Sequence, residues 1–222
     1  MRDEPNGSRS LPRGRRRFLM TTVGLMAALH VYIGWRLLPD LGWNGAGWAA
    51  GIIFLLISTV MIPTGMAARF VIRPISLADR VSWFGALLMG LFSSLFVLTL
   101  LRDIALIVLP QAYRHDSALL VVALTLLVTL IGYVNARRIP RVARVTVPIA
   151  GLPAPLHGFT IAQITDLHVG PTIKRAYVAG VVDRLNALQP DVIAVTGDLV
   201  DGEVEVLRPH IAPLAGMSAR LL

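Results

Sequence analysis

Four long runs of apolar residues lie before residue 136, and they constrain the fold of this chain more than any other feature of its sequence. They cover about residues 18–38, 48–70, 81–101 and 118–134. A helix needs about 20 mostly apolar residues to cross a membrane, so the sequence predicts a four-helix transmembrane domain over residues 18–135. Apolar residues make up 55% of the chain and charged residues 15%, against about 45–50% and about 25% in soluble domains. An ordinary soluble protein is therefore excluded.

The arginines gather on alternate sides of the apolar runs. The tail of residues 1–17, the loop after the second run and the segment after the fourth are rich in Arg, whereas the other two loops are poor. Because basic segments stay in the cytoplasm, we expect a multi-pass protein of the cell (inner, cytoplasmic) membrane with its C-terminal part on the cytoplasmic face. This placement also explains the net charge of +8, so membrane lipids are expected as partners and nucleic acid is not.

Two features of the first run leave alternatives open. Arg15, Arg16 and Arg17 precede Phe18 in a pattern that resembles a twin-arginine export signal. Since three more runs follow, the simpler interpretation is a basic flank of the first span, and a role in export stays open. His30 lies inside the run, where an ionisable residue either serves a ligand or transport function or bonds to a neighbouring helix.

The chain changes character after Asn135. Residues 136–157 are interpreted as a juxtamembrane linker and a first strand, because apolar residues alternate at Val145, Val147 and Ile149. The following segment, 158–222, contains two short apolar strands, 159–165 and 191–196, on either side of an amphipathic helix, 173–188. A strand, helix and strand in this order predict a parallel pair with a right-handed crossover, and hence an α/β domain.

Acidic residues and a histidine follow the two strands. Asp166 and His168 come after the first, and Asp198 and Asp201 come after the second. Ligands of α/β sheets bind at the carboxyl ends of the strands, and neighbouring carboxylates repel each other unless a cation lies between them. Carboxylates combined with imidazole suit Mn, Fe or Zn. Gly197 allows the sharp backbone turn that such a site requires.

The pair of motifs, Asp166-x-His168 and Gly197-Asp198-x-x-Asp201, resembles the calcineurin-like metallophosphoesterase family, most closely its bacterial membrane-linked branch. The resemblance implies an αββα sandwich that holds two divalent metal ions, either Mn, Fe or Zn. It implies that Asp166 and His168 bind the first metal ion and that Asp198 bridges both. Asp201 would support these ligands without binding metal itself, and Gly197 would form the turn.

The expected fold is thus a multi-span α-helical membrane domain followed by a partial α/β metallophosphoesterase domain. The family's later Gly-Asn-His-Glu/Asp and Gly-His-x-His blocks do not occur in the sequence, so residues 158–222 match only the N-terminal part of that domain. We therefore expect a truncated domain whose catalytic residues are unknown and which hydrolyses little when alone.

The resemblance implies a membrane-anchored hydrolase of a phosphomonoester, phosphodiester or pyrophosphate, with a dinuclear metal site that is incomplete in this chain. A lipid-linked phosphoester is one candidate substrate. Two alternatives stay open, a non-catalytic membrane anchor or interaction protein and a transporter-like membrane protein. Replacing Asp198 distinguishes them from the enzyme, because only the enzyme would lose metal and activity.

Overall fold

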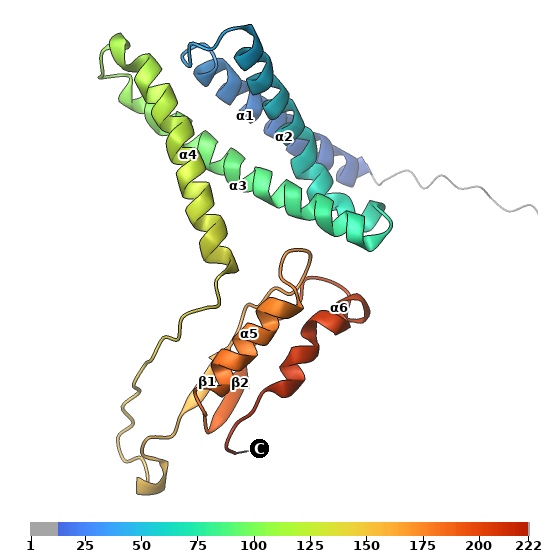
Figure 1. The fold of residues 1–222 in the computed structure, drawn as a ribbon, viewed down its shortest axis with the longest axis vertical. Helices are drawn as coiled ribbons and strands as arrows, with labels where there is room; N and C mark the ends of the chain where they lie inside the picture. The colour runs from blue at the N-terminus through green and yellow to red at the C-terminus, as the bar shows by residue number, and fades with distance from the viewer. Residues whose placement is uncertain (1–12, 222) are drawn as a thin grey trace, which may run out of the picture. The chain divides into compact units, whose positions relative to one another are not determined.

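The computed structural model describes residues 13–221, and the chain divides into two compact units between Leu130 and Ile131 (Figure 1). Most of the basic tail of residues 1–17 lies outside the described residues. The first unit is built from four long helices, of which the last continues across the boundary between the units. These helices are α1 (Arg13–Leu37), α2 (Gly45–Val71), α3 (Ile75–Ala105) and α4 (Arg114–Arg137), with the short turn η1 (Gln111–Tyr113) before α4.

Three helices of the described part are long and apolar enough to cross a membrane, namely Gly45–Val71, Ile75–Ala105 and Gln111–Arg137. The last of these ranges consists of η1 and α4 together. The first expected span, residues 18–38, coincides with α1 up to Leu37, and α1 is not among the three. His30 and Arg36 lower the mean hydropathy of the described part of α1. A membrane protein with three candidate spans is therefore supported, and the fourth span stays a prediction.

Helices α2 and α3 approach each other through two glycines, Gly65 and Gly85. A Cβ atom added to either one would lie 2.9 Å from the Cα atom of the other. Ser82 of α3 donates a hydrogen bond of 3.0 Å to the carbonyl oxygen of Gly65. Small residues at such a crossing let two membrane helices pack backbone against backbone, so this contact fixes the distance between α2 and α3.

His30, which lies buried inside the first unit, bonds both within its own helix and to α2. The two ring nitrogens of His30 lie 2.8 Å from the carbonyl oxygen of Met26 and 2.9 Å from the hydroxyl of Ser58. Its ring also stacks on Phe92, with 4.3 Å between the ring centroids. Because both nitrogens of His30 are engaged, the structure favours the packing interpretation of this residue over a ligand or transport role.

Arg102 of α3 connects three helices at the end of the unit where α1 stops and α4 begins. It is buried, and its guanidinium donates to oxygens of four residues, namely Arg36, Asp40, Arg114 and Ser117. Charges inside a membrane protein are usually paired in this way. Arg102 therefore holds α1, the loop that follows it and α4 together.

The second unit contains the predicted strand, helix and strand. They are β1 (Ile161–Ile164), α5 (Arg175–Asn186) and β2 (Val192–Val195), followed by α6 (Val204–Ile211) and η3 (Ala212–Gly216). The strands are parallel, with Ile161 opposite Val192 and Ile164 opposite Val195. Helix α5 covers one face of this pair and forms the core with it (Figure 1). The residues described here form a single two-stranded sheet, so the expected αββα sandwich stays a prediction.

The strand expected over residues 145–149 is not formed. Residues 139–149 have no regular secondary structure, and the side chains of Val145 and Val147 are 81% and 70% exposed. Alternating apolar residues provide the period of a strand, but backbone groups also need hydrogen-bond partners on a neighbouring strand. Within the described part of the chain no strand pairs with this segment.

Candidate metal centre

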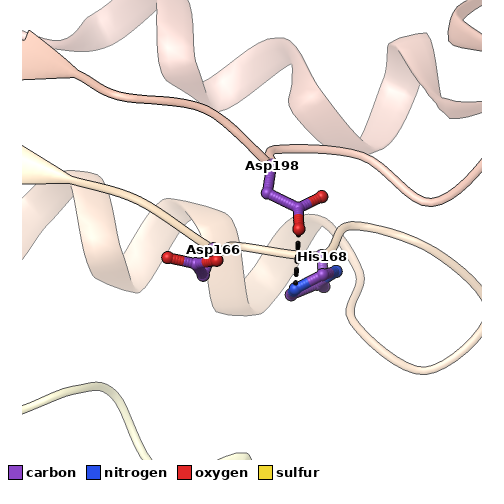
Figure 2. A group of neighbouring side chains, drawn as sticks. All are labelled: Asp166, His168 and Asp198. Atoms are coloured by element: carbon purple, nitrogen blue, oxygen red, sulfur yellow. Dashed lines mark ion pairs between the residues drawn. The ribbon is translucent and has the colours of Figure 1, made fainter.

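The segments that follow β1 and β2 run side by side beyond the regular strands. The backbone N–H of Asp166 donates to the carbonyl oxygen of Gly197 at 3.2 Å, and that of His168 donates to Asp198 at 3.2 Å. A parallel bridge between Val169 and Val200 closes the ladder. These bonds hold the two segments in register, so the side chains of Asp166, His168 and Asp198 meet at one edge of the sheet (Figure 2).

Three of these residues have a left-handed backbone conformation. The φ angles are 55° at Asp166, 48° at His168 and 52° at Asp198. This conformation costs a residue with a Cβ atom about 1–2 kcal/mol, and such residues gather at functional sites. Gly197 has a φ of 121°, and a Cβ atom added there would meet nothing within 4 Å. Glycine is thus required at position 197 by its backbone angle and not by crowding.

Asp166, His168 and Asp198 offer ligand atoms that all lie within 4.8 Å of one another. The Nε2 atom of His168 is 3.3 Å from Oδ2 of Asp198, and Figure 2 shows the carboxylate directed at the imidazole ring. The side chains of His168 and Asp198 are 47% and 56% exposed, so an ion from solution can reach them. The structure therefore brings together the three residues that the sequence singled out as candidate ligands.

Asp201 holds the other side of the histidine ring. The Nδ1 atom of His168 lies 3.0 Å and 3.2 Å from the two carboxylate oxygens of Asp201. With its proton on Nδ1, His168 donates to Asp201 and presents Nε2 to Asp166 and Asp198. A histidine that binds metal usually donates its second ring nitrogen to a carboxylate in this way, which fixes the tautomer.

The acidic surroundings also change the protonation of His168. Its hydrogen bond with Asp201 raises the pKa of the imidazole above the ordinary value of 6.5, and the negative charges of Asp201, Asp198 and Asp166 act in the same direction. A site that favours a proton on the imidazole in this way also favours other cations. Two carboxylates with one imidazole are a donor set that suits Mn, Fe or Zn, so the residues present fit a divalent metal ion.

Sequence reasoning overlooked Thr165. Its hydroxyl donates a hydrogen bond of 2.6 Å to Oδ2 of Asp166, which restrains the carboxylate. The only signal was the position of this residue directly before Asp166. Within residues 13–221, no second group of three or more histidine and acidic residues of this kind is found. His157 and His210 do not join the cluster, so the described residues offer one group of candidate metal ligands.

Comparison with known proteins gives relatives over part of the chain. No family model and no solved structure matches the chain. The chain is 37% identical over 105 residues to a "Transmembrane protein with metallophosphoesterase domain" of Danio rerio. The matched stretch covers 47% of this chain and 24% of the relative. For the protein of the same name from Bos taurus, the identity is 38% over 102 residues, covering 46% of this chain and 23% of the relative.

A bacterial relative has a name that states a specific activity, unlike the two transmembrane relatives. The chain is 39% identical over 64 residues to the UDP-2,3-diacylglucosamine pyrophosphatase of Chlamydia trachomatis, which covers 28% of this chain and 20% of the relative. The relatives include animal and bacterial proteins, so the expected bacterial branch is supported only in part. The chain spans about a quarter of the length of the two transmembrane relatives. It is homologous, over about half of its own length, to metallophosphoesterases that include transmembrane proteins.

Proposed function

We propose that this chain carries the first metal-binding half of a membrane-anchored, metal-dependent phosphoesterase. The observation that carries the proposal is the convergence of Asp166, His168 and Asp198 within 4.8 Å at the carboxyl ends of two parallel strands. The relatives named as transmembrane metallophosphoesterase-domain proteins support it. Membrane anchoring agrees with the three candidate spans of the first unit.

Each residue of the cluster has a separate task in this proposal. Asp166 and His168 would hold a divalent ion together with Asp198, which would reach it from the opposite loop. Asp201 keeps the imidazole of His168 in the tautomer that leaves Nε2 for the metal. A bound Mn, Fe or Zn ion would neutralise charge on phosphoryl oxygens and lower the pKa of a water molecule. A dinuclear site needs further ligands beyond these three residues.

The proposed substrate is a phosphomonoester, a phosphodiester or a pyrophosphate at the membrane surface. Two observations favour a lipid-linked pyrophosphate among these. The chain has candidate membrane spans, and the Chlamydia trachomatis relative is named a pyrophosphatase of a diacylated sugar nucleotide. The clustered arginines favour the cytoplasmic face for this site.

The test uses the natural gene product in its own membranes, with Mn²⁺ and bis-p-nitrophenyl phosphate. We expect Asp198→Asn to reduce hydrolysis to background while insertion into the membrane is unchanged. Asp183→Asn is the matched control, because Asp183 is an exposed carboxylate on α5 outside the cluster. Equal activity of wild type and Asp198→Asn would refute the phosphoesterase.

Metal binding is tested separately on the 222-residue chain in detergent by electron paramagnetic resonance of Mn²⁺. We expect one Mn²⁺ per chain, little hydrolysis, and loss of binding in Asp198→Asn but not in Asp183→Asn. Unchanged Mn²⁺ binding in Asp198→Asn would remove the proposed ligand role. Metal binding without any activity of the natural gene product would favour the non-catalytic anchor instead.

A further inference from the structure

The first unit contains a cavity of about 270 Å³, lined by residues of α1, α2, α3 and α4 and of the loop after α1. Its wall is almost entirely aliphatic and aromatic. Ile33 and Leu37 of α1, Phe54 of α2, Leu95 of α3 and Val122 of α4 represent the helices that enclose it. Its volume is just below the ~300 Å³ at which pockets for drug-sized ligands begin, so it can enclose part of one lipid chain and excludes a second chain beside it.

The buried part of the cavity has one polar side-chain atom, the hydroxyl of Thr125. Thr125 is 3% exposed, and its hydroxyl has no hydrogen-bond partner in the part of the chain that the structure describes. In contrast, Thr59 and Thr99 donate to the carbonyl oxygen four residues earlier. An ordered water needs about two to four polar partners. A single hydroxyl does not supply them, so the chemistry of the wall favours an apolar occupant.

The cavity opens between α2 and α4. Ala50 of α2 and Leu126 of α4 line it and are exposed, and Trp43 at one end is 41% exposed. Both α2 and α4 belong to candidate membrane spans, so their exposed sides face hydrocarbon in a membrane. The medium at the opening is therefore lipid, which supplies acyl chains at high concentration.

The two ion pairs near one end of the cavity leave no net charge of their own to select a headgroup. Arg36 is paired with Asp103 at 2.7 Å, and Arg102 is paired with Asp40. The opposite charges within each pair neutralise each other. Both pairs lie at the end of the unit where the cavity residue Leu41 also lies. Recognition of the lipid must then come from its acyl chain. We propose that this cavity binds one acyl chain of a membrane lipid, independently of headgroup charge and of the group formed by Asp166, His168 and Asp198.

The test reconstitutes the full chain in phosphatidylcholine vesicles with a trace of phosphatidylcholine whose palmitoyl chain ends in a diazirine. After irradiation, mass spectrometry locates the adducts. We expect them to concentrate on cavity residues such as Phe54 and Leu95. Ala50→Trp fills the opening and should lower their yield at least about fivefold. Ala49→Trp is the matched control, because Ala49 is also exposed on α2 but does not line the cavity.

Two further measurements distinguish an acyl chain in the cavity from a polar ligand and from a lipid selected by its headgroup. Thr125→Val keeps the shape of the side chain and removes its hydroxyl, so adducts should persist; their loss would show that binding depends on a polar contact and would overturn the proposal. A phosphatidylglycerol probe should give the same yield as phosphatidylcholine, and a preference of about tenfold or more would overturn recognition by the chain alone. Adducts spread evenly over α2 and α4 and insensitive to Ala50→Trp, or crosslinks to a second copy of the chain, would also overturn it.

Discussion

The two units use polar residues in opposite ways. In the first unit, His30 and Arg102 are buried, and each bonds to at least one neighbouring helix. In the second, Asp166, His168 and Asp198 are exposed and held on a left-handed backbone. Bonds between elements stabilise the first unit, whereas clustered carboxylates in the second repel one another unless a cation binds. The buried and bonded polar groups His30 and Arg102 are thus structural, whereas exposed polar groups on a strained backbone mark a candidate site.

The largest effect is expected from Arg102→Leu, which removes the buried charge and leaves Asp40 without its partner. Breaking a buried ion pair from one side destabilises by about 3–5 kcal/mol. Unfolding in mixed detergent, followed by circular dichroism, measures this loss. Arg138→Leu is the control, because Arg138 is exposed after α4. If both variants unfolded alike, the structural role of the buried network would be wrong.

The second prediction concerns the crossing of α2 and α3. In Gly85→Ala the added Cβ atom would lie 2.8 Å from the carbonyl oxygen of Met61, so the variant should lose about 1–3 kcal/mol of stability through overpacking. Gly132→Ala in α4 meets nothing within 4 Å and should gain up to about 1 kcal/mol from better helix propensity. The same unfolding assay measures both, and effects of equal sign would contradict the close contact.

The third prediction tests Asp201. Removal of a carboxylate that supports a metal-binding histidine usually lowers metal affinity about 10–100-fold. Asp201→Asn should lower Mn²⁺ affinity by this amount in the resonance assay and should bring the pKa of His168 down towards 6.5, as measured by NMR. Asp183→Asn should change neither quantity. A normal pKa of His168 together with wild-type affinity would show that the contact between His168 and Asp201 is incidental.

The smallest effect is the dependence of metal binding on pH. A metal ion must displace the proton from His168, so affinity falls by up to about tenfold per pH unit below the pKa of that residue. Since the hydrogen bond with Asp201 raises this pKa above 6.5, the loss of Mn²⁺ affinity should begin above pH 6.5 as pH decreases. In Asp201→Asn it should begin at a lower pH. The same onset in both proteins would contradict the stated cause.

Local patterns in the sequence were enough to predict the central strand, helix and strand of the second unit. Apolar periodicity predicted a helix over residues 173–188 and strands on both sides, and α5, β1 and β2 are found there. The strand order then implied that Asp166 and Asp198 lie near each other, because parallel strands end at the same edge. The structure brings these residues together with His168, while their binding of metal stays a prediction.

Other features depend on contacts between distant residues, which a local pattern does not contain. The segment at Val145 and Val147 has the period of a strand but forms none, because pairing depends on a partner. Helix α6 includes Pro209, a residue type that in a sequence indicates a break rather than a helix interior. The left-handed angle of His168 follows from the bonds that join two loops about 30 residues apart in sequence. None of these features was visible in composition or periodicity.

The irregular segment of residues 139–149 has a consequence for encounter rates. A stretch of 11 residues reaches at most about 36–40 Å when fully extended. A tether of this length would keep the second unit from diffusing freely away from a membrane that holds the first. Short tethers of this kind give effective concentrations in about the millimolar range. If the substrate is a lipid-borne phosphate, as proposed, the site would find it by a search in two dimensions. Shortening or lengthening this tether would then change turnover without altering any candidate metal ligand.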